Sequence, residues 1–381
     1  MFDVAKIIHK NKKCPPFSPK LFNKAYLYKF KRMDFGISDF SQLVSWVHAI
    51  ERYDPYRLSL QINLGNVKFQ DKLSYVLLEC LCLYLIDNKK RAINIKYNVQ
   101  PLISTDGIMW SPLSILTGMS NSLSQNYLRK FRLDIGTSHY RRVVRVEDTV
   151  KNPYYVSSLV SDIATFLKPF DVSERYRNEL AEVLGELVDN SIEHANADCL
   201  LDLDISREFT HNTTGAPYHG VNAVVMNISD RLLGDMIKGK IKNGELLNDR
   251  EIHVKDALES HQRFFDEAYT EEDFFCIASF QDRVSGRNEY SVTGGTGLTK
   301  LISSLEERAD TYDCYVLTGN KKISFSTDCL KYTDGWIGFN THQDYFGSPP
   351  DEKVITPSPI FFPGTAYNLC FAMKKEDISH A

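Results

Sequence analysis

The first half of the chain alternates between strand-like and helix-like patterns. Residues 57–98 read as one strand, helix, strand unit: RLSLQINL alternates, DKLSYVLLECLCLYLIDN has helical length, and AINIKYN is a short β-rich run. If its two strands are parallel, the crossover between them is right-handed. Residues 101–130 are rich in Pro, Gly, Ser and Asn and predict loops around short helices. Residues 129–148 predict a further strand pair that closes a first domain near residue 150.

The second half turns helical and then alternates again. Residues 152–167 and 173–195 predict helices, and Ser173 is the N-cap candidate of the second one. The apolar residues of this second helix fall on one face and predict a core contact: Leu180, Val183, Leu184, Leu187, Val188 and Ala195. Further strands are predicted in CLLDLDISRE, in GVNAVVMNISD, in a hairpin turning at Gly319 and Asn320, and in PGTAYNLCFAM. A helix is expected in ESHQRFFDEAYTEEDFF. Residues 331–360 predict an irregular insertion or a partner surface. These patterns indicate the α+β class.

Composition limits the class of protein without naming a function. With 381 residues, 43% hydrophobic and 25% charged, the chain predicts a soluble protein of about two domains. The formal charge of −4 implies no global attraction to nucleic acid. Eight cysteines without a CxxC pair predict reduced, mostly buried thiols. No signal peptide is visible, and the longest apolar run has only 12 residues, so we expect a cytoplasmic protein with no membrane partner.

The N-terminal segment is the exception to this charge balance. Residues 1–32 carry eight lysines and Arg32 against Asp3, with aromatic residues between them. Two interpretations stay open. One is a nucleic-acid arm, because lysines contact phosphates and aromatic rings stack on bases. The favoured one is a basic edge strand within AYLYKFKRMDF, where lysines discourage aggregation.

Three polar residues mark the helix predicted over 173–195. Glu186, Asn190 and His194 are spaced four apart, so they form a stripe along one flank of the apolar face. Taken alone, this stripe fits ordinary polar residues at the boundary of a core. The string ELVDNSIEHA, however, resembles the N-box of the GHKL ATPases, the superfamily of gyrase, heat-shock chaperone, histidine kinase and MutL.

The resemblance implies a role for each residue of the stripe. Asn190 would coordinate Mg²⁺ through its amide oxygen, in keeping with the preference of this cation for oxygen ligands. Glu186 would polarise the water that attacks the terminal phosphate of ATP, as a general base. His194 would pack against or contact the phosphates. The implied fold is a C-terminal two-layer α/β sandwich, the Bergerat ATP-binding fold, preceded by a smaller α/β domain.

The other GHKL boxes follow in order. Asp230 and Gly234 resemble the DxGxG box, whose aspartate binds the adenine amino group, although Leu232 replaces its first glycine. Residues 235–293 occupy the place of the mobile lid. Three residues are phosphate-contact candidates by location: Arg283, Arg287 and Lys300.

Two glycine motifs complete the resemblance, which covers roughly residues 150–375. GGTGL resembles the second glycine box of the histidine kinases, with Thr299 where a glycine is usual. It implies phosphate binding through main-chain groups. The residues concerned are Gly295, Thr296, Gly297 and Leu298. Gly364 and Thr365 resemble the terminal GT box and imply a further nucleotide contact at Thr365.

We therefore expect three regions: a basic segment (1–36), a small, possibly STAS-like α/β domain (37–150) and a GHKL-type domain (151–381). The expected function is Mg²⁺-dependent ATP binding with slow hydrolysis, acting as a switch in bacterial signalling or defence. A protein partner or self-association is expected. A sensor without turnover is the main alternative, favoured by Leu232 and Thr299. The others are an anti-sigma-like serine kinase and a nucleic-acid-binding protein.

Overall fold

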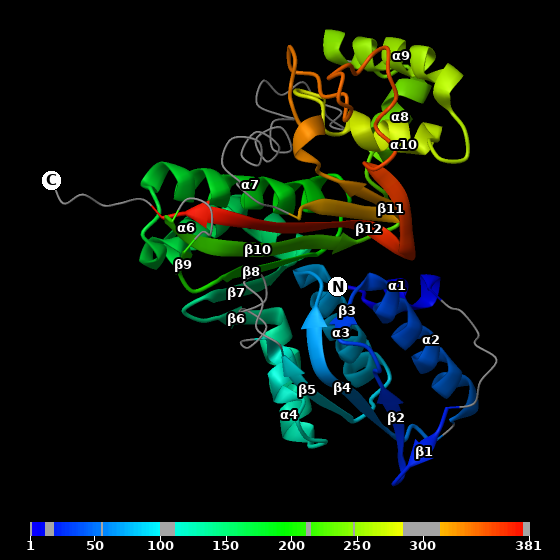
Figure 1. The fold of residues 1–381 in the computed structure, drawn as a ribbon, viewed down its shortest axis with the longest axis vertical. Helices are drawn as coiled ribbons and strands as arrows, with labels where there is room; N and C mark the ends of the chain where they lie inside the picture. The colour runs from blue at the N-terminus through cyan, green and yellow to red at the C-terminus, as the bar shows by residue number, and fades with distance from the viewer. Residues whose placement is uncertain are drawn as a thin grey trace, which may run out of the picture.

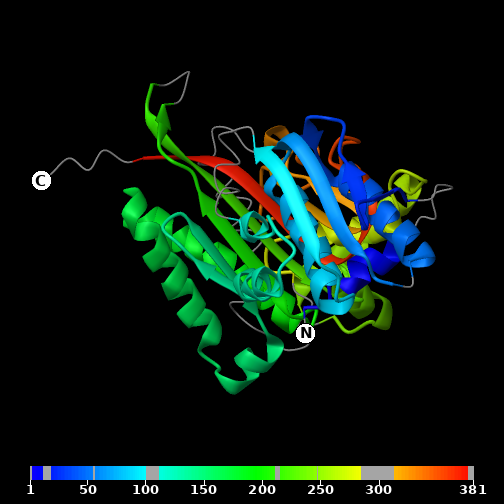
Figure 2. The ribbon, with the colours of Figure 1, turned by 90° about the horizontal axis from the view of Figure 1, so that it is seen from below.

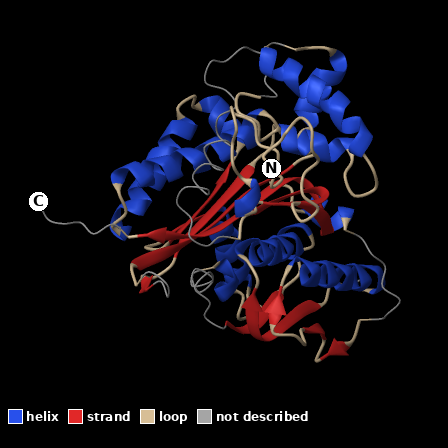
Figure 3. Cartoon of the chain, turned by 45° about the horizontal axis from the view of Figure 1, so that its top comes forward, coloured by secondary structure: helices blue, strands red, loops and turns tan. Residues whose placement is uncertain are grey.

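The fold combines two β-sheets with two layers of helices. The computed structural model describes residues 2–11, 19–54, 56–99, 111–210, 215–246, 248–284 and 313–375. Figure 1 shows the larger sheet across the middle, the small sheet with its helices below it, a second helix layer above it and further helices at the upper right. Figure 3 shows the larger sheet between the two helix layers. The molecule is of the α+β class, as the sequence predicts.

The small sheet is built around its long central strand, β4. Strand β2 and then β3 pair with one side of β4, and β5 pairs with the other, all in parallel, while β1 adds to β2. The predicted strand, helix, strand unit is confirmed as β4, α3 and β5. The expected basic edge strand is an edge over part of its length. Strand β1 covers β2 only at Ala25 and Tyr26, and among the described residues the rest of β2 and β3 pair with β4 alone. The strands are β1 (Leu21–Phe22), β2 (Ala25–Lys29), β3 (Asp34–Phe35), β4 (Ser59–Phe69) and β5 (Ile93–Val99).

Helices fill the space between the two sheets. Every residue of α3 is buried, because α3 has a sheet on either side, and a helix covered all round is apolar on most of its faces. A π-helical turn, Tyr84–Asn88, extends it. The helices of this layer are α1 (Ala5–Lys10), α2 (Ile37–Tyr53), α3 (Lys72–Leu83) and α4 (Asn121–Arg132), with a 3₁₀ turn at Pro112–Ile115.

The larger sheet is antiparallel, in the order β11-β12-β10-β8-β7-β6, and β9 also pairs with β10. The strand pair expected to close the first domain, β6 and β7, belongs to this sheet, because β7 pairs with β8. Figure 2 shows the β9 and β10 end projecting beyond the small sheet. The strands are β6 (Leu133–Ile135), β7 (His139–Val144), β8 (Cys199–Ile205), β9 (Phe209–Thr210), β10 (Pro217–Ile228), β11 (Tyr315–Ser324) and β12 (Ile355–Lys374).

The prediction of a hairpin turning at Gly319 and Asn320 is wrong. Strand β11 runs straight through both residues and pairs with β12 along its whole length. Gly319 adopts a φ of 54°, and the register shifts on both sides of it. The extra residues at both shifts lie on β12, so β12 bulges opposite Gly319. Gly319 takes up this φ without a Cβ penalty inside a continuous strand, and it makes no turn between two strands.

Alternate residues of the larger sheet point to opposite faces, and each face packs in a separate hydrophobic core. On β10, Val221, Ala223 and Val225 pack with the upper helices, whereas Val224 and Met226 pack with the lower layer. The upper helices are α5 (Val146–Lys151), α6 (Tyr155–Leu167) and α7 (Glu174–Glu193), with a 3₁₀ turn at Lys168–Phe170. Because the sheet is covered on both faces, β8 is buried at every position.

A third group of helices forms a cap, which we define as residues 235–246, 248–284 and 326–354. The helix expected in ESHQRFFDEAYTEEDFF is two elements, and a capping box at Thr270 starts the second. The irregular segment packs on the helices of this cap, because Trp336 lies beside the ring of His253 and Tyr345 stacks on the ring of Phe274. The helices are α8 (Asp235–Asn243), α9 (Asp249–His261) and α10 (Glu271–Ala278), with 3₁₀ turns at Gln262–Phe264 and Thr327–Cys329.

Two further findings concern the part of the chain that the structure describes. None of its helices combines the length and apolar character needed to cross a membrane. Seven cysteines are free and six of these are buried: Cys80, Cys82, Cys199, Cys276, Cys314 and Cys329, with Cys370 partly exposed.

Candidate functional site

The helix predicted to carry the chemistry forms as expected. Ser173 accepts a hydrogen bond from the amide of Tyr176 at 3.2 Å, which caps the first turn of α7. Its predicted core face is buried at Leu180, Val183, Leu184, Leu187 and Val188. Ala195 lies beyond the helix end and is partly exposed.

Glu186, Asn190 and His194 share one flank of α7, next to its buried face. Each is partly exposed, which places the stripe at the boundary between core and solvent. His194 is the C-cap residue, and its amide donates to the carbonyl of Asn190 at 3.0 Å. The helix therefore holds the two candidate ligand groups, the carboxylate and the amide, one turn apart.

Beneath the last turns of α7, the sheet presents a buried polar cluster. The Asn227 amide donates to Ser191 Oγ at 3.2 Å, and Ser191 Oγ donates to the carbonyl of Leu187 at 3.0 Å. Asn227 lies directly opposite Thr365 in the pairing of β10 with β12. Ser191, Asn227 and Thr365 are 4%, 4% and 7% exposed. Because Ser191 follows Asn190, this cluster directly adjoins the stripe on α7.

Gly364 and Thr318 bring three strands together beside this cluster. Gly364 has a φ of 100°, and a Cβ there would lie 2.5 Å from the carbonyl oxygen of Asn227. Thr318 Oγ1 donates to the carbonyl of Gly364 at 2.9 Å and accepts from the amide of Leu233 at 3.0 Å. The resemblance to a GT box thus coincides with a position where the backbone requires glycine.

Asp230 lies at the surface rather than within this buried cluster. Its side chain is 80% exposed and pairs with the ammonium of Lys6 on α1 at 2.7 Å. The hydrogen bond and the charge of Lys6 lower the pKa of the Asp230 carboxyl. Thr365 instead faces α7, together with Asn227. The structure therefore puts Asn227, not Asp230, opposite the residue of the GT box.

Gly234 occupies a position that only glycine fits. It is the N-cap of α8 with a φ of 87°, and a Cβ would lie 2.5 Å from the backbone carbonyl of Phe275. The preceding residues, Leu232 and Leu233, are held by Asp235 and Thr318 through their amides. The loop from β10 into the cap is thus fixed by its backbone.

The predicted phosphate-binding turn, Gly295, Thr296, Gly297 and Leu298, lies outside the described residues, as do Arg287 and Lys300. Arg283 is described. It has a φ of 57° and a side chain that is 71% exposed and lies 3.7 Å from the carboxylate of Asp282.

Sequence reasoning missed Ser191 and Asn227. A signal existed for Asn227, because it interrupts the apolar run AVVM in a strand that is buried on both faces. Ser191 gives a weaker signal, since serine is common at helix boundaries. Its role follows from its contact with Asn227.

A second polar cluster joins α3 to the larger sheet. The Lys72 ammonium lies between the carboxylates of Asp202 and Asp204, at 2.6 Å from Asp202 Oδ1. Arg141 pairs with Asp202 and with Glu79 of α3, and His139 Nδ1 lies 2.5 Å from Asp204 Oδ1. We call this group the α3 ionic cluster: Lys72, Glu79, His139, Arg141, Asp202 and Asp204.

The ligand groups of His139, Asp202 and Asp204 lie close enough together to hold a metal ion. However, Lys72 already places a cation between the two carboxylates. Burial alone would raise the pKa of Asp204, but the charges of Lys72 and His139 outweigh it and hold the pKa below its usual range. The protein itself therefore supplies cationic partners for these carboxylates.

Comparisons of this chain with protein-family models, with curated proteins and with solved structures found no match.

Proposed function

We propose that this chain binds Mg²⁺ and ATP between α7 and the adjoining ends of β10 and β12, in a sandwich of the GHKL type. The observation that carries the proposal is the cluster of Ser191, Asn227 and Thr365 beneath the helix that bears Glu186 and Asn190. One helix flank offers oxygen ligands, and the sheet below offers buried groups that recognise a base.

The layering supports a Bergerat-like arrangement of the second half of the chain. Helices α6 and α7 cover one face of the antiparallel sheet, in which β10 and β12 are neighbours. Strand β12 carries the predicted GT box, and the predicted DxGxG box follows directly after β10. The boxes come from segments that are far apart in the sequence. Their meeting at one end of α7 is what a binding site between the two layers requires.

The donor chemistry of α7 fits the proposed cation. Asn190 offers an amide oxygen, which suits Mg²⁺, and its partial exposure leaves room for the waters that this ion retains. Glu186 lies one turn earlier on the same flank, where it would orient a water and accept its proton. Bound ATP would supply the phosphate at which that water reacts.

Asn227 takes the part in base recognition that the sequence assigned to Asp230. The hydroxyl proton of Ser191 goes to Leu187, so Ser191 Oγ accepts from Asn227 Nδ2, and the amide oxygen of Asn227 points away from Ser191. That oxygen lies 3.2 Å from Ser229 Oγ, whose single proton also reaches the carbonyl of Arg231 at 2.8 Å, so it keeps at least one lone pair for a ligand. An amide pairs well with adenine, because it accepts from the amino group and donates to a ring nitrogen.

Replacement of Asn227 tests base recognition directly. Asn227→Leu keeps the shape of the side chain and removes its hydrogen bonds, so ATP affinity measured by calorimetry should fall by about tenfold to a hundredfold. The matched control is Asn222→Leu, since Asn222 is equally buried on β10 but faces the lower layer. Equal ATP affinity in the two variants would contradict the assignment.

Turnover separates an ATPase from a sensor. If the protein hydrolyses ATP, Glu186→Ala should abolish phosphate release without loss of ATP binding, and Glu182→Ala, an exposed position one turn earlier, should release phosphate like the wild type. Binding without release in the wild type indicates a sensor. Transfer of labelled phosphate to a serine of a partner indicates a kinase.

A further inference from the structure

The N-terminal helix α1 contacts the two segments that flank the proposed base-binding position. It has only six residues, and a helix this short is not stable without packing. Ile7 and Ile8 are fully buried, and the ring of His48 on α2 donates to the carbonyl of Ile8 at 2.9 Å. One side of α1 is thus fixed in the lower helix layer.

Asn11, which ends α1, binds the backbone of β12 as a neighbouring strand would. Its side-chain amide donates to the carbonyl of Phe361 at 2.8 Å, and its oxygen accepts from the amide of Phe361 at 2.8 Å. Asn11 is 7% exposed, so these bonds are shielded from water. Phe361 lies four residues ahead of Thr365 on the same strand.

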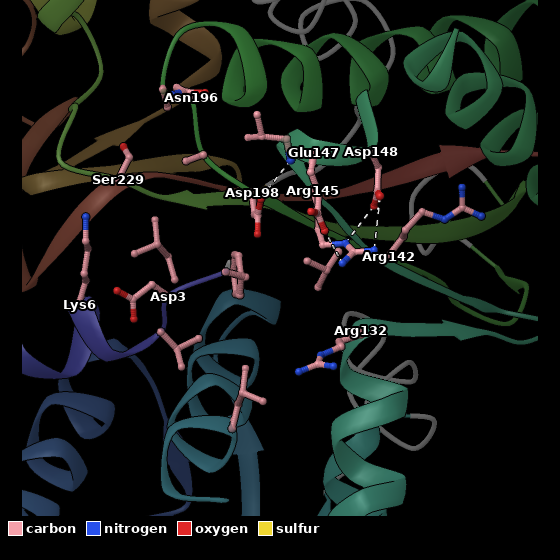
Figure 4. Close-up of a pocket in the computed structure, with 18 of the residues that line it drawn as sticks. Asp3, Lys6, Arg132, Arg142, Arg145, Glu147, Asp148, Asn196, Asp198 and Ser229 are labelled. Carbon is pink, nitrogen blue, oxygen red and sulfur yellow. Dashed lines mark hydrogen bonds and ion pairs between the residues drawn. The ribbon is translucent and has the colours of Figure 1, made fainter. Parts of the chain in front are cut away.

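Lys6 contacts the other segment. Its ammonium pairs with Asp230, three residues beyond Asn227, and Figure 4 shows Lys6 pointing toward the loop that begins at Ser229. Beside this pair, an open cleft of about 1370 Å³ separates part of α1 from the end of α7. The side of α1 that carries Lys6 therefore has open space next to it rather than a packed neighbour.

Hydrogen bonds connect both contacts to the base-binding cluster. The Ser229 amide donates to the carbonyl of Pro363 at 3.3 Å. The Ser229 hydroxyl lies 2.8 Å from the carbonyl of Arg231 and 3.2 Å from Asn227 Oδ1, and it shares its one proton between them. A displacement of Asp230 or of Phe361 would consequently shift Asn227 relative to Thr365. We call the pairs Lys6 with Asp230 and Asn11 with Phe361 the α1 contact.

We propose that the α1 contact regulates the nucleotide site, so that docking of α1 and binding of ATP favour each other. This inference rests on the proposed function. Docked α1 holds the ends of β10 and β12 in the register that places Asn227 opposite Thr365, which is the arrangement that binds the base. By thermodynamic linkage, ATP must then hold α1 in place to the same degree.

A charge reversal tests the first half of this coupling without disturbing the core, because Lys6 is a partly exposed side chain. Lys6→Glu should weaken ATP binding by about fivefold or more. The double variant Lys6→Glu with Asp230→Lys restores both the pair and the original net charge, and should recover the affinity. Lys31→Glu changes the net charge equally at an exposed position of the same basic segment and should leave ATP affinity unchanged.

Hydrogen exchange tests the reciprocal half. In the wild type, amides of residues 5–11 should exchange more slowly when Mg²⁺ and ATP are added, and this slowing should disappear in Asn227→Leu. If the wild type binds ATP, but Lys6→Glu binds it equally and exchange in α1 does not respond, the regulatory inference fails and the proposed function stands. If the wild type binds no ATP, both fail.

Discussion

At the scale of the residue, Gly234 shows how tightly the loop after β10 is constrained. Its φ of 87° lies in the region that side chains avoid, and the backbone of Phe275 occupies the space of a Cβ. The constraint positions α8 of the cap directly behind the predicted DxGxG box. The glycine that matches this box is therefore required by the fold itself.

Gly234→Ala should lower the free energy of unfolding by about 2 kcal/mol, because it adds both backbone strain and a clash. Gly239→Ala is the matched control, since Gly239 lies within α8 with nothing within 4 Å of a Cβ. That control should stabilise the protein by about 0.5–1 kcal/mol, as alanine favours a helix. Urea unfolding measures both, and a similar effect of the two substitutions would contradict the account.

Single residues were partly predictable from the sequence. The spacing of Glu186, Asn190 and His194 correctly placed these side chains on one flank of α7. That Asn227 lies opposite Thr365 was not predictable in this way, because it depends on the register between β10 and β12, which are separated by more than a hundred residues. An aspartate at the end of a strand matched the motif, but the strand pairing decides which residue faces Thr365.

At the scale of the element, ion pairs and hydrogen bonds, together with apolar packing, hold α3 against the larger sheet. Its first turn brings Lys72 between two carboxylates of β8, and the amide of Leu73 donates to the side chain of Asn368 on β12 at 3.1 Å. The N-cap residue Asp71 accepts from Tyr315 of β11 at 2.8 Å. The start of α3 is thus bonded to three strands of the larger sheet.

Removal of one partner from the α3 ionic cluster leaves buried charges uncompensated. Lys72→Met should therefore cost about 3–5 kcal/mol of unfolding free energy. The control, Lys90→Met, removes a lysine whose side chain is 66% exposed and pairs with Asp87, and it should cost about 0–1 kcal/mol. Denaturant titration of the two variants gives the comparison, and equal midpoints would show that the cluster adds nothing to stability.

Most elements were predictable because their patterns are local. The apolar face of α7 and the alternation in β4 each identify an element without reference to the rest of the chain. The position of β7 was not predictable, since its partner β8 lies beyond the three intervening helices α5, α6 and α7. Strand β11 was mistaken for a hairpin because a glycine and an asparagine favour a turn locally, whereas pairing with the long strand β12 keeps this segment extended.

At the scale of the whole molecule, the N-terminal half is part of the same body as the second half. One core contains residues from both, including Leu78 and Leu81 of α3 and Val224 and Met226 of β10. The STAS-like resemblance of residues 37–150 suggested a module that folds separately. The shared core predicts instead that the two halves support each other.

The protein should consequently unfold in one transition. Calorimetry should show a single peak whose calorimetric and van't Hoff enthalpies agree, as expected of a two-state system. Lys72→Met removes the ion pairs of Lys72 with Asp202 and Asp204, which join the two halves, so its single peak should shift to lower temperature. Two separate peaks in the wild type would show that the halves are independent domains.

In the folded molecule, two lysines of the basic N-terminal segment make contacts within the chain. Lys6 pairs with Asp230, and Lys10 lies over the ring of Phe361. These two lysines serve contacts within the chain. This use favours an internal role for the start of the segment over the nucleic-acid arm that its composition suggested.

The proposal that Asn190 holds Mg²⁺ for bound ATP is tested by the Mg²⁺ dependence of ATP binding. Calorimetric titration with ATP, with and without Mg²⁺, should be run on the wild type, on Asn190→Ala, and on the control Asn126→Ala, a partly exposed asparagine on helix α4. We expect Mg²⁺ to tighten ATP binding in the wild type and in the control but not in Asn190→Ala. An unchanged Mg²⁺ effect in Asn190→Ala, or no ATP binding by the wild type, would contradict the account.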